Sequence, residues 1–154
     1  MANRHDLEPE ILLVGIGNSG RSDDGLGWAF LDRIQEEAAF DGQVEYRYQL
    51  QVEDAALISA VKHVIFVDSY SGELPDGFQL ARCEPLRERP FTTHVLPPGV
   101  VLSLCRDLYG RAPRADTLLI QGTCWDLGIG MSPAAERRLE NALRFFESHW
   151  RGIR

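Results

Sequence analysis

Residues 11–16, Ile-Leu-Leu-Val-Gly-Ile, form a short run without a polar side chain that ends at a Gly-Asn pair. Such a run is typical of a strand in a parallel sheet that is covered on both faces. After a polar stretch, apolar residues recur every four positions and predict a helix over residues 25–37. This strand, loop and helix constrain the chain to an α/β fold.

Strand and helix patterns alternate along the rest of the chain. Further strands are expected at residues 44–48, 64–67, 78–83 and 117–120, and further helices around 57–61, from Pro98 to Gly110, and from Pro133 onward. We therefore expect a single domain over residues 1–154 with a three-layer α/β/α architecture. Its open, mostly parallel, twisted sheet should have about five strands, with helices on both faces.

Charge and hydropathy exclude several classes of function. The chain has 16 basic and 23 acidic residues and a net charge of −7, which disfavours binding to nucleic acid or to anionic lipid. No apolar run approaches the roughly 20 residues that a membrane span needs. The first residues lead into acidic sequence rather than a signal-peptide core. We expect a cytoplasmic protein that binds neither nucleic acid nor a membrane.

The cysteines do not suggest a site. Cys83, Cys105 and Cys124 are odd in number and never spaced as C-x-x-C, which excludes a zinc ribbon, a thioredoxin-type pair and a disulfide framework. None has a histidine nearby in sequence, so a thiol protease is not expected.

Polar residues follow the first and third predicted strands, which we expect to be neighbours. Asp23 and Asp24 follow the first strand, Asp68 ends the third, and His94 lies in a long proline-rich loop. Ligands of open α/β sheets bind at the carboxyl ends of such strands. Carboxylates with one imidazole suit a borderline divalent cation such as nickel or zinc.

Each of these residues also has a structural interpretation. Asp24 could favour the N-terminus of the first helix, Asp68 could bond its own turn, and His94 could be an ordinary loop histidine. The other histidines, His5, His63 and His149, are expected to have structural or solvent-exposed roles.

Residues 15–20 satisfy the G-x-G-x-x-G pattern of dinucleotide-binding proteins. In that motif the third glycine lies in a helix, whereas here Arg-Ser-Asp-Asp follows and places two carboxylates where pyrophosphate should bind. Nucleotide binding is therefore disfavoured.

An acidic pair after the first strand and an aspartate ending the third also describe a phospho-accepting receiver domain. That class implies a lysine at the end of the last strand, where this chain has Gln121-Gly-Thr-Cys. The sole lysine, Lys62, precedes the third strand. A receiver-like regulator remains an alternative, as does a metal-dependent hydrolase that carries its own ion.

Several motifs, in order along nearly the whole chain, resemble those of the nickel-iron hydrogenase maturation endopeptidases. They lie at residues 15–18, 22–27, 66–69, 93–94, 121–122 and 128–133. The resemblance implies an endopeptidase that removes a C-terminal extension from the hydrogenase large-subunit precursor after nickel insertion. It also implies nickel supplied by that substrate, and no tightly bound organic cofactor.

The resemblance assigns three residues to the site. The positions that ligate a metal in the family correspond to Asp24, Asp68 and His94, which we take as the predicted catalytic and metal-binding residues. Some relatives have a glycine-rich segment after the second strand, implicated in recognition of the substrate. Residues 48–54, Tyr-Gln-Leu-Gln-Val-Glu-Asp, contain no glycine, so the identity of the substrate is open.

Overall fold

The computed structural model describes residues 11–37, 40–86 and 96–153. Five strands form one sheet in the order β2-β1-β3-β5-β4, and only the edge strand β4 runs antiparallel to its neighbour. The strands are β1 (Leu12–Ile16), β2 (Gln43–Arg47), β3 (His63–Tyr70), β4 (Phe78–Arg82) and β5 (Arg114–Gln121).

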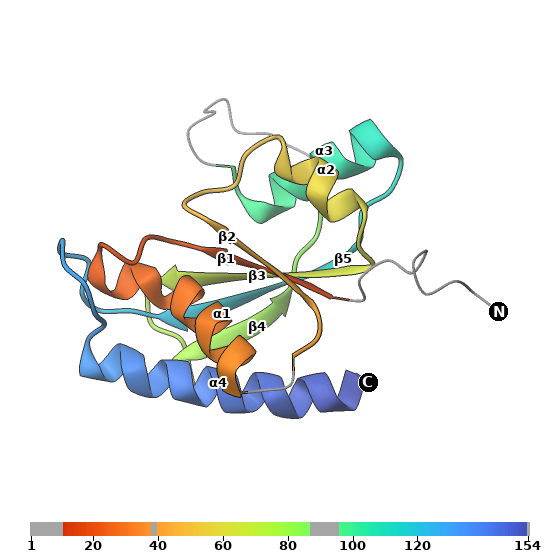
Figure 1. Cartoon of the computed structure of the whole chain (residues 1–154). Coiled ribbons are helices and arrows are strands. Elements are labelled where there is room, and N and C mark those ends of the chain that lie inside the picture. The colour runs from red at the N-terminus through yellow and green to blue at the C-terminus, as the bar shows by residue number, and fades with distance from the viewer. Residues whose placement is uncertain (1–10, 38–39, 87–95, 154) are drawn as a thin grey trace.

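Helices cover both faces of this sheet. The helices α1 (Leu26–Glu37) and α4 (Pro133–Ile153) pack on one face, while α2 (Asp54–Ser59) and α3 (Pro98–Tyr109) pack on the other (Figure 1). A short 3₁₀ helix, η2 (Ser22–Gly25), lies between β1 and α1. The three-layer α/β/α architecture with a mostly parallel sheet is confirmed.

The apolar run of β1 divides between the two layers of the core. Leu13 faces α1 and α4, where it packs with Phe30 and Phe146, whereas Leu12 and Val14 face α2 and α3. All of these side chains are buried. A strand buried on both faces is the reason for the continuous apolar run.

The predicted start of α4 and the predicted end of α3 are confirmed. Ser132 caps α4 by accepting a hydrogen bond at Oγ from the N–H of Ala135 (3.2 Å), and α3 ends before Gly110. The prediction that the third strand stops at Asp68 is wrong, because β3 continues to Tyr70. Its last residues pair with the end of β5, so the ladder continues through polar residues.

The start of α1 lies very close to the sheet. A Cβ atom on Gly27 would come within 2.5 Å of the carbonyl oxygen of Val67 and 2.6 Å of that of Ile16. Only glycine therefore allows α1 to begin directly over β1 and β3. This packing places η2 beside the carboxyl ends of both strands. None of the described helices is long and apolar enough to cross a membrane.

Candidate active site

A cavity of about 370 Å³ lies at the carboxyl ends of β1 and β3. Asp24 and Asp68 both line it, so the structure brings together the two carboxylates that the sequence places after these strands. In the sheet, β2 lies on one side of β1 and β3 lies on the other. The chain connections therefore run in opposite directions from β1, and this position is the switch point of the sheet, where α/β folds bind ligands. The rest of the lining comes from three segments: Ile16 and Gly17, Tyr48 to Leu50, and Leu96 to Pro98.

Asp24 is positioned by the turn after β1. Gly17 has φ +152°, and a Cβ atom there would lie 2.0 Å from the carbonyl oxygen of Asp24. The same oxygen accepts a hydrogen bond from the N–H of Asn18 (3.0 Å). Gly17 is thus required for the chain to fold back and present Asp24 to the cavity.

Ser69 connects the two carboxylates. Its N–H donates to Oδ1 of Asp68 (2.8 Å), and its hydroxyl donates to Oδ1 of Asp24 (3.3 Å). The first bond is the local turn interaction that the structural interpretation of Asp68 expected, yet Asp68 still lines the cavity. Ser69 was not predicted to be a site residue, although its place directly after Asp68 could have indicated it.

The site raises the pKa of both acids. Burial raises the pKa of Asp68 to about 7, the N–H of Ser69 opposes this, and the nearby charge of Asp24 adds to it. Burial also raises the pKa of Asp24, against the opposing effects of Ser69 and Arg21. Neither carboxylate forms a salt bridge with a cation in the described part of the chain. A bound cation would stabilise both charged forms, since an opposite charge at this range lowers a carboxyl pKa.

The third predicted site residue, His94, lies outside the described residues. Among those that are described, no group of three or more His, Cys, Asp or Glu side chains is arranged to hold a metal ion. Asp24 and Asp68 supply two hard oxygen ligands, which is an incomplete set for a nickel or zinc ion.

Asp23 does not line the cavity, contrary to the expectation that it lies with Asp24 and Asp68 at the ligand-binding end of the sheet. Its buried carboxylate accepts hydrogen bonds from the N–H groups of Thr123 (2.7 Å), Cys124 (2.9 Å) and Ser132 (2.8 Å), and from the hydroxyl of Ser132 (2.8 Å). Burial alone would raise the pKa of Asp23, but these bonds outweigh it and lower the pKa. Asp23 therefore fastens the loop between β5 and α4 to η2.

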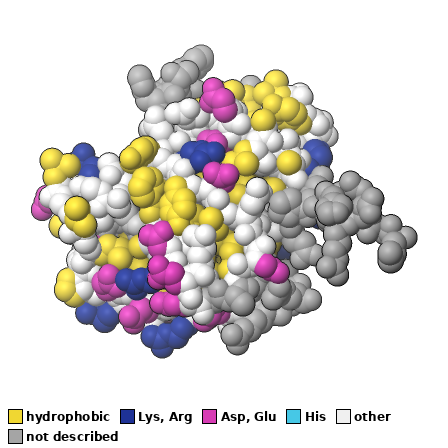
Figure 2. All heavy atoms as spheres, viewed as in Figure 1, with side chains coloured by type: hydrophobic (Ala, Val, Ile, Leu, Met, Phe, Trp, Pro, Cys, Tyr) yellow, Lys and Arg dark blue, Asp and Glu magenta, His cyan; other side chains and the backbone are white. Residues whose placement is uncertain are grey.

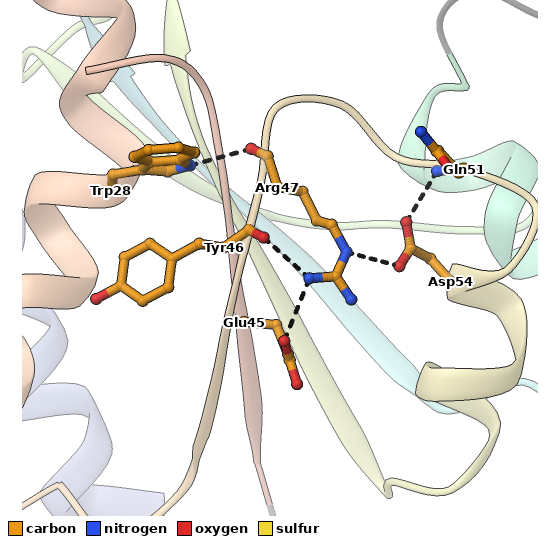
Figure 3. A network of polar contacts seen from close by, with 6 residues as sticks. All are labelled: Trp28, Glu45, Tyr46, Arg47, Gln51 and Asp54. Atoms are coloured by element: carbon orange, nitrogen blue, oxygen red, sulfur yellow. Dashed lines mark hydrogen bonds and ion pairs between the residues drawn. The ribbon is translucent and has the colours of Figure 1, made fainter. Parts of the chain in front are cut away.

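The wall formed by the segment after β2 is held by a polar network (Figure 3). Arg47 donates from Nε to Oδ1 of Asp54 (3.0 Å) and from Nη1 to Glu45 (3.2 Å), and Oδ2 of Asp54 accepts the N–H of Gln51 (2.8 Å). The carbonyl oxygen of Arg47 accepts a bond from Nε1 of Trp28 (3.0 Å). Both ends of residues 48–54, a segment that contains no glycine, are thereby fixed.

The three cysteines and the two described histidines, His63 and His149, do not line the cavity. His63 forms a buried pair with Asp116 (2.6 Å) at the amino ends of β3 and β5, which agrees with a structural role. Burial raises the pKa of Cys83 to about 11, so its thiol is protonated at neutral pH. No cysteine of the described chain lines the cavity.

The structure also bears on the two alternatives from other protein classes. Gly20 lies in the loop before η2 rather than in a helix, unlike the third glycine of a dinucleotide motif. Lys62 is exposed and precedes β3, so it lies at the opposite end of the sheet from Asp68. The residue that ends β5 is Gln121, whose Oε1 accepts the N–H of Leu74 (2.8 Å). The arrangement is that of an α/β protein with a two-carboxylate site at the switch point.

Solved structures of hydrogenase maturation proteases share this fold over almost the whole chain. The hydrogenase maturating endopeptidase HybD from E. coli superposes with a TM-score of 0.75 at 21% identity, covering 94% of this chain and 93% of its own. The [NiFe] hydrogenase maturation protease HycI from Thermococcus kodakarensis KOD1 gives a TM-score of 0.68 at 22% identity, with 92% of each chain covered.

A hydrogenase 2 maturation peptidase from Thaumarchaeota archaeon SCGC_AB-539-E09 gives a TM-score of 0.65 at 17% identity, covering 92% of this chain and 97% of its own. No protein-family model and no curated protein matches the sequence. The resemblance stated from the motifs is confirmed as a likeness of the whole fold.

Proposed function

We propose that this protein is an endopeptidase that removes a C-terminal extension from the large-subunit precursor of a nickel-iron hydrogenase after nickel has been inserted. The observation that carries the proposal is that Asp24 and Asp68 line one cavity at the switch point. This cavity occurs in a fold shared with solved hydrogenase maturation proteases.

In this proposal, Asp24, Asp68 and His94 are ligands that sense the nickel of the substrate. The positions of Asp24 and Asp68 support this role because both are oxygen donors at one cavity, and neither forms a salt bridge among the described residues. His94 would complete the set, and it precedes by two residues a segment, Leu96 to Pro98, that lines the same cavity.

The reaction is hydrolysis of one peptide bond. A water molecule attacks the scissile carbonyl carbon, the C–N bond breaks, and the leaving amine takes up a proton. The metal of the substrate or a site carboxylate activates the water.

The proposal is tested by incubating purified protein with nickel-loaded precursor and measuring the mass of the large subunit. Wild-type protein should remove the extension. Asp24→Ala, Asp68→Ala and His94→Ala should each lower the cleavage rate by at least about a hundredfold, because the loss of one member of a site that acts as a unit removes nearly all of its activity. His149→Ala is the matched control, because it changes an exposed side chain on α4, and it should retain full activity. A fully active His94→Ala protein would overturn the site assignment.

The competing enzyme class is a hydrolase with its own metal ion. Elemental analysis of gently purified protein distinguishes the two, because a nickel-sensing protease should hold far less than one equivalent of metal. One equivalent of zinc, together with activity on a precursor without nickel, would favour the competing class.

A further inference from the structure

We propose that the loop between β5 and α4, together with the adjoining face of α1, is a docking surface for the protein substrate. The docked segment of the substrate presents an aliphatic side chain next to a lysine or arginine. This inference rests on the proposed function, since the substrate is the protein that the enzyme cleaves.

Two large aliphatic side chains of this loop are almost fully exposed. Leu127 is 79% exposed and Ile129 is 96% exposed. Figure 2 shows hydrophobic side chains projecting at the left edge of the molecule, where Figure 1 places the loop. Two aliphatic side chains exposed to this extent on one loop are available to contact a protein partner.

The loop that carries these side chains is held in one conformation. The N–H of Gly128 donates to Gly20 (2.9 Å), and the carbonyl oxygen of Gly128 accepts the N–H of Ser22 (2.9 Å). The hydroxyl of Ser22 donates to the carbonyl oxygen of Asp126 (2.7 Å). Asp23 binds both ends of the loop, as described above. A preorganised apolar loop loses little conformational entropy on binding, which favours a docking role.

A hollow of about 240 Å³ lies beside the loop, and its lining residues indicate which side chains of a partner would bind there. Apolar surface from Trp28, Ile129 and Met131 lines it, which suits an aliphatic side chain. Asp32 is the one charged residue among its described lining residues. Asp126, next to Leu127, is exposed. These two acids favour a basic side chain beside the aliphatic one.

The hollow lies next to the cavity that contains Asp24 and Asp68, which favours the substrate as the partner. Both are built on η2: Ser22 and Gly25 line the hollow, whereas Asp24 lines the catalytic cavity. Tyr48 also lines the catalytic cavity, and its ring centroid lies 5.1 Å from that of Trp28, which lines the hollow. A chain bound in the hollow can therefore pass over Tyr48 to the carboxylates.

The test compares the cleavage kinetics of nickel-loaded precursor by the wild type, Leu127→Asp and Ile129→Asp. Both variants change exposed side chains, so their thermal unfolding should match that of the wild type. We expect each to raise KM at least about tenfold while kcat stays within about twofold, because docking energy is lost without change to the carboxylates. Asp32→Asn should raise KM severalfold and reduce its dependence on salt.

Leu108→Asp is the matched control, because Leu108 is 60% exposed near the end of α3. That end leads into the start of β5, at the opposite end of the sheet from the cavity. This variant should keep the wild-type KM. If the wild type cleaves the precursor and Ile129→Asp has an unchanged KM, the docking surface alone is wrong. If the wild type neither binds nor cleaves the precursor, the proposed function fails and the named partner with it.

Discussion

Asp23 and Asp24 are consecutive residues of η2, and their carboxylates contact different parts of the molecule. Asp23 accepts hydrogen bonds from the loop between β5 and α4, and Asp24 lines the cavity that it shares with Asp68. One short 3₁₀ helix thus carries a structural acid and a site acid side by side.

The first prediction separates these two roles. Asp23→Ala should lower the free energy of unfolding by about 3 kcal/mol or more, because it leaves several buried N–H groups without an acceptor. Asp24→Ala should change stability by no more than about 1 kcal/mol and abolish cleavage. Urea unfolding of both variants measures the difference. Equal stability losses would show that the division of roles is wrong.

The second prediction concerns the pH dependence of stability. The pKa of Asp68 is raised from 3.8 to about 7 in the folded protein, so the folded state binds more protons than the unfolded state between these values. Its carboxyl therefore does not destabilise the fold below about pH 4, and the cost to stability develops as the pH rises from about 4 to about 7.

Asp68→Asn removes this cost because its side chain carries no charge. The variant should be more stable than the wild type at pH 8, by on the order of 2–4 kcal/mol. At pH 4 the two proteins should differ by much less. Urea unfolding at both pH values, in chelator, provides the measurement. A wild type as stable as the variant at pH 8 would contradict the raised pKa.

The third prediction concerns the hydroxyl between the two carboxylates. Ser69→Ala removes one hydrogen bond to Asp24 but leaves the backbone bond to Asp68, so cleavage should fall by about tenfold or less. Complete loss of activity in a folded Ser69→Ala protein would instead indicate a nucleophilic serine.

A Cys83→Ser, Cys105→Ser, Cys124→Ser variant that remains folded should also cleave the precursor.

The local signals of the sequence predict most of the fold. The apolar run of β1 requires burial on both faces, and Ser132-Pro133 marks the start of α4 as a cap followed by proline. The end of β3 was not predictable in this way. Asp68, Ser69 and Tyr70 carry no apolar pattern, and they form a strand because β5 pairs with them.

The candidate site was predictable only in part, for a related reason. Placing Asp24 and Asp68 at the ends of neighbouring strands requires only the topology, and both line the cavity. The role of Asp23 depends on donors about a hundred residues further along the chain. No local pattern distinguishes it from Asp24.

The proposed recognition of nickel bound to the substrate is tested by comparing precursor with and without nickel. Zinc-free enzyme is incubated in chelator with nickel-loaded and with nickel-free precursor, and the mass of the large subunit is followed over time. We expect the nickel-loaded precursor to lose its C-terminal extension and the nickel-free precursor to stay intact, because the metal completes the productive geometry. Equal rates of cleavage for the two precursors would contradict it.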